Sequence, residues 1–359
     1  MRSDKHVKQH KRNRTIKRVA LGVGLLLAII IGTIVGYYGN QISEFLADVS
    51  NETPDDMQST DEQEEILRDL HPISILLLGI DATEEPRRSD TMIVATINPE
   101  DESVKLVSIP RDTLITLPDS DRLEKVNAVY PIYGISGVVD FVSEYLQIPI
   151  SFYATLNFQG LVDLVDAVGG ISVDSPLSFT VQDSEENSEA IVIEEGVQQL
   201  DGEHALGYAR MRKQDPRGDF GRQERQREVI QSLANELLSF SSLTNVTPIL
   251  NAIRPNLQTN MTPQQILFVS SNYSSSARNI ESLEMAGQAD YVYVPSYGQE
   301  LYVWLPYENT LRDIQESLQE HMELDEIMTD DSVDYHTIEG GPDEEEENVM
   351  PTEEDEVIQ

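Results

Sequence analysis

The sequence of 359 residues predicts an α/β domain with a mixed central sheet covered by helices on both faces, preceded by one transmembrane helix. Three observations support this class. The continuous apolar run Ile73–Ile80 is typical of a strand buried on both faces. Segments with strand and helix patterns alternate irregularly after it. The chain contains no cysteine, so an exported domain must rely on a large core, and roughly 250 residues suffice for one.

The N-terminus is predicted to be a membrane anchor. Residues 1–18 contain eight Lys and Arg and one acid, Asp4, and Val19–Tyr38 gives 20 residues without a charge. That length matches the ~20 residues needed to cross a bilayer as a helix. The excess of cations places residues 1–18 in the cytoplasm and everything after Tyr38 outside the cell membrane. A cleavable signal peptide is the alternative, although its apolar core is usually ~7–15 residues long.

Polar segments flank the predicted folded domain, which spans residues 72–322. Residues 39–71 are expected to form an extracellular linker, polar over Ser50–Glu65, with a short helix through Leu70. Residues 323–359 hold 16 acids in 37 positions and no Lys or Arg. We expect this tail to be disordered because it cannot build a core. The functional alternatives are a self-repelling brush facing an anionic wall and a sink for cations.

Strands dominate the first half of the predicted domain. After Ile73–Ile80, Thr91–Ile97 and Ser103–Ile109 are separated by a short polar turn, a spacing that suggests a hairpin. The stretch Val126–Leu146 is mainly helical, with interruptions at Pro131 and Gly134. The remaining elements of this half are a strand, a helix that ends at a Gly pair, and a second strand: Phe152–Leu156, Phe158–Ala167 and Ile171–Val173.

Helices dominate the second half. Asp201 can cap a helix through about Leu206. A longer helix is predicted over Glu224–Phe240, with an apolar stripe on one face. The stripe consists of Val229, Leu233 and Leu237. The last predicted elements are the strand Val292–Pro295 and the helix Asn309–His321.

Positive charge is concentrated in one short part of an acidic chain. The net charge is −39, from 25 Lys and Arg against 64 Asp and Glu. A cluster of planar guanidinium groups in such a chain suggests a site for a phosphate or pyrophosphate. The alternative is a solvated helix face that pairs with its own acids. The seven cations of this stretch are Arg210, Arg212, Lys213, Arg217, Arg222, Arg225 and Arg227.

The periodicity suggests which of these cations converge. If the segment Tyr208–Arg212 is extended, its two arginines lie on one face together with Tyr208. In the following helix, Arg222 and Gln226 extend the apolar stripe by one turn, so we expect them to point into a cleft. Asp219 is either the N-cap of this helix or an acid of the active site, and local pattern favours the cap.

Two acids flank the ends of adjacent strands. Asp81 follows the first strand, at the edge where α/β sheets bind ligands, and Asp90 precedes the second. Together they could hold Mg²⁺, which takes one or two carboxylates, keeps waters and binds phosphate oxygens. Turn residues are the alternative for both. Arg111, followed by Lys125, also stands at a strand end, and it could either pair with Asp112 or point to the same edge.

These segments, taken in order, closely resemble the LytR-CpsA-Psr family of Gram-positive cell-wall enzymes, most strongly over about Pro72–Phe240. The segments that carry the resemblance are Gly79-Ile80-Asp81, Arg88-Ser89-Asp90-Thr91-Met92, Ser108-Ile109-Pro110-Arg111-Asp112-Thr113, Lys125-Val126-Asn127-Ala128, Asn157-Phe158-Gln159-Gly160, Val165-Asp166-Ala167-Val168-Gly169-Gly170-Ile171, Leu200-Asp201-Gly202, Tyr208-Ala209-Arg210-Met211-Arg212 and Asp219-Phe220-Gly221-Arg222-Gln223-Glu224-Arg225-Gln226.

The resemblance implies an activity. Family members move an anionic glycopolymer, such as teichoic acid or capsular polysaccharide, from undecaprenyl pyrophosphate to N-acetylmuramic acid of peptidoglycan. It implies that Asp81 and Asp90 hold Mg²⁺. It also implies catalytic roles for Asp81, Arg111, Arg210, Arg212 and Asp219. The residues implied in binding the pyrophosphate are Arg88, Arg111, Lys125, Arg210, Arg212, Arg222, Arg225 and Gln226.

Three other functions are weighed against this one. A membrane-tethered transcriptional regulator needs a DNA-binding part in the cytoplasm, where only 18 residues lie, and the anionic exported part opposes binding to nucleic acid. A phosphatase acting on polyprenyl pyrophosphate would use the same residues, with water in place of the sugar hydroxyl. A wall-polymer binding module without catalysis is the third.

Overall fold

A computed structural model describes residues 60–80, 88–118, 120–183, 187, 190–239, 256–324 and 335–339. The predicted transmembrane segment, the basic segment before it and Asp81 lie outside these residues. Among the helices that are described, none combines the length and the apolar character needed to cross a membrane.

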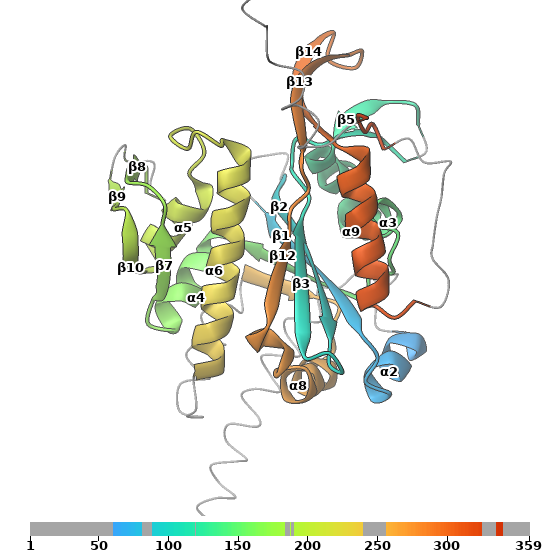
Figure 1. Cartoon of the computed structure of the whole chain (residues 1–359), viewed down its shortest axis with the longest axis vertical. Helices are drawn as coiled ribbons and strands as arrows, with labels where there is room; N and C mark the ends of the chain where they lie inside the picture. The colour runs from blue at the N-terminus through green and yellow to red at the C-terminus, as the bar shows by residue number, and fades with distance from the viewer. Residues whose placement is uncertain are drawn as a thin grey trace, which may run out of the picture.

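The centre of the fold is a six-stranded sheet with the order β11-β6-β1-β2-β3-β12 (Figure 1). β1 pairs antiparallel with β2 and parallel with β6, and β2 pairs antiparallel with β3. β12 runs parallel to β3, and β11 antiparallel to β6. The predicted mixed sheet and its hairpin are therefore confirmed. The strands are β1 (Ile73–Ile80), β2 (Ser89–Asn98), β3 (Ser103–Ser108), β6 (Phe152–Asn157), β11 (Leu257–Thr259) and β12 (Ile280–Leu283).

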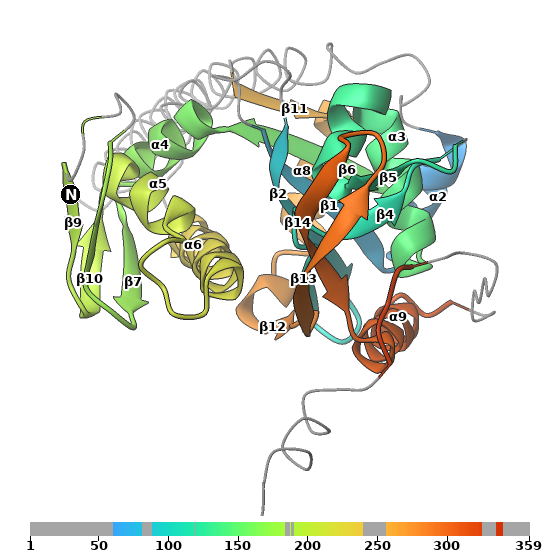
Figure 2. The same cartoon turned by 90° about the horizontal axis from the view of Figure 1, so that it is seen from above.

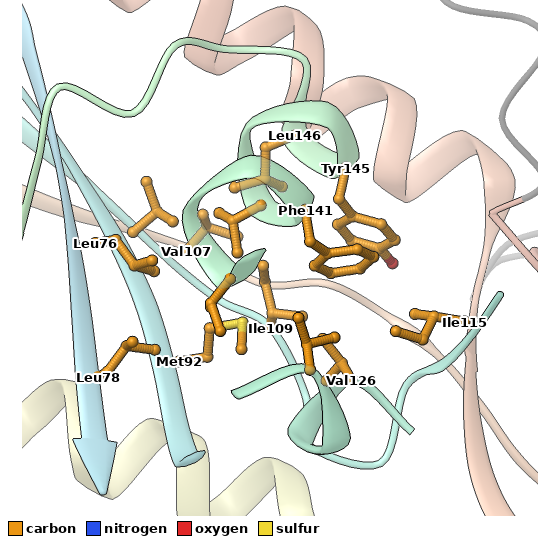
Figure 3. Packing of buried hydrophobic residues seen from close by; sticks show 14 of the residues in the cluster. Leu76, Leu78, Met92, Val107, Ile109, Ile115, Val126, Phe141, Tyr145 and Leu146 are labelled. Carbon is orange, nitrogen blue, oxygen red and sulfur yellow. The ribbon is translucent and has the colours of Figure 1, made fainter. Parts of the chain in front are cut away.

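Helices cover both faces of this sheet, as predicted. The helices α3 (Val129–Leu146) and α9 (Glu308–His321) pack on one face, with Gly134 interrupting α3 at φ 70°. Figure 3 shows the resulting core, in which side chains of β1, β2 and β3 meet one side of α3. On the opposite face, α6 (Asp219–Ser239) covers β2 and β3 through Ile230 (Figure 2).

A smaller lobe packs against the other side of α6 and has its own core. Strand β7 pairs with β10, β8 pairs with β9, and α4, α5 and α6 close the core over them. Tyr208 lies at its centre and is fully buried. The elements of this lobe are α4 (Phe158–Ala167), β7 (Ile171–Ser175), β8 (Phe179–Val181), β9 (Ile191–Ile193), β10 (Gly196–Leu200) and α5 (Gly202–Arg210).

The remaining elements lie at the two ends of the sheet (Figure 1). The short helix predicted at the end of the linker is α2, and Thr60 and Gln63 form its capping box. α2 and α8 share a small core at one end, and a long hairpin of β13 and β14 projects at the other. These elements are α2 (Asp61–Arg68), β4 (Leu114–Thr116), β5 (Leu123–Lys125), α8 (Pro263–Asn272), β13 (Gly287–Val294) and β14 (Gln299–Pro306).

The segment Tyr208–Arg212 is not extended, so the prediction that Tyr208 shares a face with the two arginines is wrong. Asp201 does cap a helix, since its side chain accepts a hydrogen bond from the backbone N–H of His204 at 2.9 Å. The helix then continues past Leu206 to Arg210, and Ala205, Tyr208 and Ala209 bury their side chains in the core of the small lobe. Tyr208 points into the small lobe, while Arg210 is exposed.

Part of the acidic tail lies against the domain, contrary to the expectation of disorder along its whole length. Tyr335 accepts a hydrogen bond from the Gln147 side chain at 2.8 Å and packs edge-on against Tyr145. Ile338 bridges to Tyr307, and its backbone N–H donates to Pro306 at 3.1 Å. These contacts partly bury an aromatic and an aliphatic side chain that interrupt the run of acids.

Candidate active site

A cavity of about 420 Å³ opens where β2 begins, α5 ends and the N-terminal part of α6 passes. Ser89 of β2 pairs with Ile80 of β1, so this is the edge at which β1 ends, as the sequence predicts. The charged wall has five cations and three acids, which gives a positive site in an anionic protein. The cations are Arg111, Arg210, Arg212, Lys213 and Arg222, and the acids are Asp90, Asp183 and Glu203.

Arg111 is held at the cavity wall by Asp90. Its Nη1 lies 2.8 Å from Asp90 Oδ1, and both side chains are about one quarter exposed. Arg111 Nε also lies 3.8 Å from Asp112 Oδ2. The sequence left open whether Arg111 pairs with Asp112 or points to the edge that it shares with Asp90. In the structure Arg111 does both. The two carboxylates fix the plane of the guanidinium. The exposed part of the Arg111 side chain lines the cavity.

Asp112 is the carboxylate on which the positive side chains converge. It is only 9% exposed, and Lys125 Nζ lies 2.8 Å from its Oδ1. Arg212 Nη1 lies 3.8 Å from its Oδ2, on the side that Arg111 also approaches. One buried carboxylate therefore positions three cations and leaves an excess of positive charge beside the cavity. Asp112 was not among the predicted site residues, although its position next to Arg111 in a segment of the resemblance pointed to it.

Arg210 reaches the cavity from the last residue of α5. Its guanidinium carbon lies 4.5 Å above the ring of Phe158, the first residue of α4. The start of α4 is fixed, because the Asn157 side chain accepts a hydrogen bond from the N–H of Gly160 at 2.8 Å. The cation–π contact therefore holds an exposed arginine over a rigid support.

Arg222 and Gln226 point inward from α6, as the apolar stripe predicts. Both line the cavity, and Arg222 is 5% exposed. Val229 and Leu233 continue the same side of the helix into the core. The side chain of Leu237 lies outside the described part of the chain. α6 itself begins at Asp219, so this residue is the first of the helix and not its N-cap.

Arg225 faces away from the cavity, which corrects the expectation that it binds the pyrophosphate. It is 1% exposed, and its Nη1 lies 2.5 Å from Asp215. Its other nitrogens donate to the carbonyl oxygens of Tyr208 and Met211. Burial acts to raise the pKa of Asp215, but the hydrogen bonds from Arg225 and from the Arg217 N–H lower it below its ordinary value. Arg225 therefore shapes the loop that carries Arg212.

The other predicted residues divide into three cases. Arg88 is exposed and is not among the residues that line the cavity. Lys125 also lies outside the lining and acts through Asp112. Asp81 and the side chain of Asp219 lie outside the described residues, so their predicted metal-binding and catalytic roles stay predictions.

A second cavity, of about 360 Å³, adjoins the first and is almost entirely apolar. Side chains of β1, β6, α4 and α6 form its walls, including Leu77, Ala154, Leu161 and Ala234. These residues could not be predicted from the sequence because they have the composition of an ordinary core. The two cavities share the five residues Thr91, Phe158, Leu206, Arg210 and Gln226.

The donor set fits Mg²⁺ better than a metal that needs several protein ligands. Asp90 offers a carboxylate at the cavity wall. Across the described ranges, no group of three or more His, Cys, Asp or Glu side chains is arranged to hold a metal ion. Mg²⁺ is commonly bound by one or two carboxylates together with waters and substrate phosphates. The Asp90 carboxylate is therefore compatible with such a site, and Asp81, outside the described residues, stays the predicted second ligand.

Comparison with known proteins decides the family. A model of the LytR_cpsA_psr family matches residues 37–320. The chain belongs to this family. A relative in Halalkalibacterium halodurans, named polyisoprenyl-teichoic acid–peptidoglycan teichoic acid transferase TagU, is 34% identical over 316 residues, which cover 86% of this chain and 100% of the relative.

Solved structures of relatives have the same fold. The crystal structure of TagV from B. subtilis has a TM-score of 0.61 at 34% identity and covers 71% of this chain and 98% of TagV. A structure of TagT bound to LIIa-WTA has a TM-score of 0.61 at 26% identity and covers 74% of this chain and 94% of TagT. These matches confirm the predicted LytR_cpsA_psr resemblance and the prediction that the protein is a transferase.

Proposed function

We propose that this LytR_cpsA_psr protein transfers an anionic glycopolymer from undecaprenyl pyrophosphate to N-acetylmuramic acid of peptidoglycan outside the cell membrane. The junction of a cationic cavity with an apolar one carries the proposal. A polyprenyl pyrophosphate has a doubly anionic head directly attached to a long apolar chain. The shared wall formed by Phe158, Arg210 and Gln226 lies where the head would meet the chain.

The transfer is an in-line displacement at phosphorus. The C6 hydroxyl of N-acetylmuramic acid attacks the phosphorus that carries the glycopolymer, and the bond from this phosphorus to the bridging oxygen breaks. The products are a phosphodiester and the polyprenyl phosphate, and the hydroxyl proton passes to a base. Such reactions need positioning and neutralisation of charge more than covalent help. Arg210, Arg212 and Arg222 would bind the two phosphates, and Arg111, oriented by Asp90, would stabilise the leaving oxygen.

Magnesium belongs to the same proposal. When bound by Asp90 and Asp81, Mg²⁺ would neutralise charge on the phosphate oxygens. The Asp90 carboxylate would serve both functions, since its Oδ1 binds Arg111 and its second oxygen would be left to hold the metal. The names of the TagU relatives favour teichoic acid as the polymer. The predicted N-terminal anchor would keep the cavity beside the membrane that holds the lipid carrier.

The decisive experiment follows labelled polymer from a polyprenyl-pyrophosphate donor to peptidoglycan. We expect Arg210→Ala and Arg212→Ala to lose transfer by about 100-fold or more, the size found when one donor to a developing anion is removed. Arg312→Ala is the matched control, because Arg312 is exposed on α9 away from the cavity. Near wild-type transfer by both cavity variants would contradict the proposal. Label released into solution instead of bound to peptidoglycan would favour the phosphatase.

The metal has its own test. We expect Asp90→Ala to lose the dependence of transfer on Mg²⁺, measured by titrating the metal. Because alanine also releases Arg111, Asp90→Asn serves as a second variant that keeps a hydrogen-bond acceptor for the guanidinium. Asp140→Ala, an exposed acid on α3, is the control. An unchanged magnesium titration in both Asp90 variants would remove the metal from the proposal.

The apolar cavity is tested by filling it. Ala234 lines it from α6, and Ala234→Phe adds a ring to its interior. We expect KM to rise several-fold for a donor with a long polyprenyl chain and to change little for a donor with a short chain, because only the long chain needs the filled space. Equal effects on both donors would show that the lipid lies elsewhere.

A further inference from the structure

The hairpin of β13 and β14 carries aromatic side chains that none of the steps above uses. Tyr291 and Tyr293 are 66% and 58% exposed, which is unusual for large aromatic side chains. Alternation along a strand places both on one face of the hairpin. Tyr291 stands opposite Tyr302, with ring centroids 5.8 Å apart, and Ala289 stands opposite Trp304. The face is thus a row of rings that begins at Trp304 and ends at Tyr293.

This aromatic row starts at the candidate active site. The Trp304 backbone N–H donates to the Asp112 carbonyl oxygen at 2.8 Å, and the Trp304 ring packs edge-on against Phe220 at the start of α6. The Tyr302 ring lies 5.5 Å from the guanidinium carbon of Arg212 and 5.9 Å from Lys125 Nζ. Arg212 therefore contacts the row on one side and lines the cationic cavity on the other. The exposed rings continue outward from that point.

The chemistry of the row fits a glycan. A sugar ring presents partly positive C–H groups that pack against the negative face of an aromatic ring, and the tyrosine hydroxyls can hydrogen-bond its hydroxyl and acetamido groups. The charge of the hairpin argues against the anionic donor polymer as the occupant. Between Gly287 and Pro306 the chain has two acids, Asp290 and Glu300, and no Lys or Arg. The same charge and the position of the hairpin, at the opposite end from α2 (Figure 1), argue against a membrane surface.

We propose that the β13–β14 hairpin is the platform on which the glycan strand of the acceptor stacks before transfer. This inference rests on the proposed function, whose acceptor it assigns to a surface. A strand lying on Tyr293 and Tyr291 would run along the row toward Tyr302, where its next sugar reaches the cations that hold the donor. The hairpin thus separates the two substrates by charge: the cavity takes the polyanion, and the aromatic row takes the acceptor glycan.

The test measures binding and kinetics in the full-length chain. The probe is insoluble peptidoglycan stripped of attached polymers, and bound protein is measured by co-sedimentation. We expect the double variant Tyr291→Ala/Tyr293→Ala to bind about tenfold more weakly, because it loses two ring contacts that each strengthen binding by a few-fold. Tyr291→Phe/Tyr293→Phe keeps the rings and should retain binding. Val197→Ala, at an exposed position of β10, is the matched control.

The kinetic arm separates this inference from the proposed function. In the double alanine variant, KM for peptidoglycan should rise while kcat and KM for the lipid-linked donor stay unchanged. Arg210→Ala should bind peptidoglycan like the wild type although it does not transfer. If no form of the protein transfers polymer but binding still depends on the tyrosines, the proposed function fails and the glycan platform remains.

Three results would overturn the inference. The first is unchanged sedimentation of the double alanine variant with stripped peptidoglycan. The second is a loss confined to free teichoic acid, which would make the row part of the donor site. The third is a loss confined to vesicles of anionic phospholipid, which would make the hairpin a membrane-binding element.

Discussion

The cations of the stretch from Tyr208 to Arg227 differ in their surroundings: some line the cavity and others are buried elsewhere in the fold. Arg210 and Arg222 line the cavity, and the first of them is exposed. Arg225 and Arg227 are buried on other sides of α6, where Arg225 binds Asp215 and Arg227 donates to the Ser108 hydroxyl at 3.1 Å. The density of arginines therefore does not indicate which of them bind a ligand. The decisive feature is whether the guanidinium lines the cavity or is buried in another part of the fold.

The largest test of this division is Arg225→Ala. It leaves the Asp215 carboxylate buried without its main partner, and removing one member of a buried ion pair typically costs about 3–5 kcal/mol. We expect the free energy of unfolding to fall by that amount, measured by denaturant titration. Arg312→Ala, at an exposed ion pair on α9, should change it by less than about 0.5 kcal/mol.

The acid side of the stability profile gives a second readout of the same pair. Burial acts to raise the pKa of Asp215, but the hydrogen bond from Arg225 and the other contacts outweigh it. The pKa of Asp215 in the folded protein therefore lies below its unfolded value. Its contribution is therefore present above the ordinary value of 3.8 and is lost as pH falls through the folded pKa. In the Arg225→Ala variant, the free energy of unfolding should therefore fall less on acidification than in the wild type. An Arg225→Ala protein as stable as the wild type, with the same acid profile, would end the structural assignment of Arg225.

A smaller effect is expected from Tyr208→Phe, two residues before Arg210 on the same helix. Burial raises the pKa of Tyr208, and so does its hydrogen bond to Glu228, whose Oε2 accepts the hydroxyl at 2.5 Å. Removing a hydrogen bond to a charged group costs about 1.5–3 kcal/mol. We expect that loss of stability with unchanged transfer per folded molecule. Tyr293→Phe, which removes an exposed hydroxyl, should leave stability unchanged; a loss of transfer in Tyr208→Phe would place Tyr208 in the site.

The contrast between Tyr208 and Arg210 also shows how far the sequence could predict the fold. The period of two that placed Tyr208, Arg210 and Arg212 on one face requires a strand, and five residues are too few to distinguish a strand from the end of a helix. Two longer patterns gave the right bounds, although the helix predicted from Glu224 begins five residues earlier, at Asp219. The strand Ile73–Ile80 and the helix Phe158–Ala167 have the predicted bounds, because a run of eight or more residues contains several repeats of its period.

The candidate site was predictable where a residue shares an element with its neighbours and not where it depends on distant ones. Arg222 and Gln226 followed from the stripe of α6. Tyr302 could not have been found, because its place beside Arg212 arises from the docking of β14 against a distant segment. Trp304 of β14 forms a β-bridge with Thr113, 191 positions earlier in the chain. The apolar cavity could not be predicted for another reason. Its walls have the same composition as a packed core, and only the space between them distinguishes the cavity from a core.

The smallest expected change in stability is that of Arg210→Ala. This arginine has one identified support, the Phe158 ring at 4.5 Å, and a cation–π contact at an exposed site is worth about 0.5–1 kcal/mol. We expect the free energy of unfolding to fall by no more than that, by the same denaturant titration, while transfer is lost. Arg210→Lys keeps the charge but not the planar fork, so it should restore stability more fully than transfer. If Arg210→Ala unfolded as readily as Arg225→Ala, the two arginines would belong to one structural network, and the cationic cavity would lose the side chain that joins it to the apolar one.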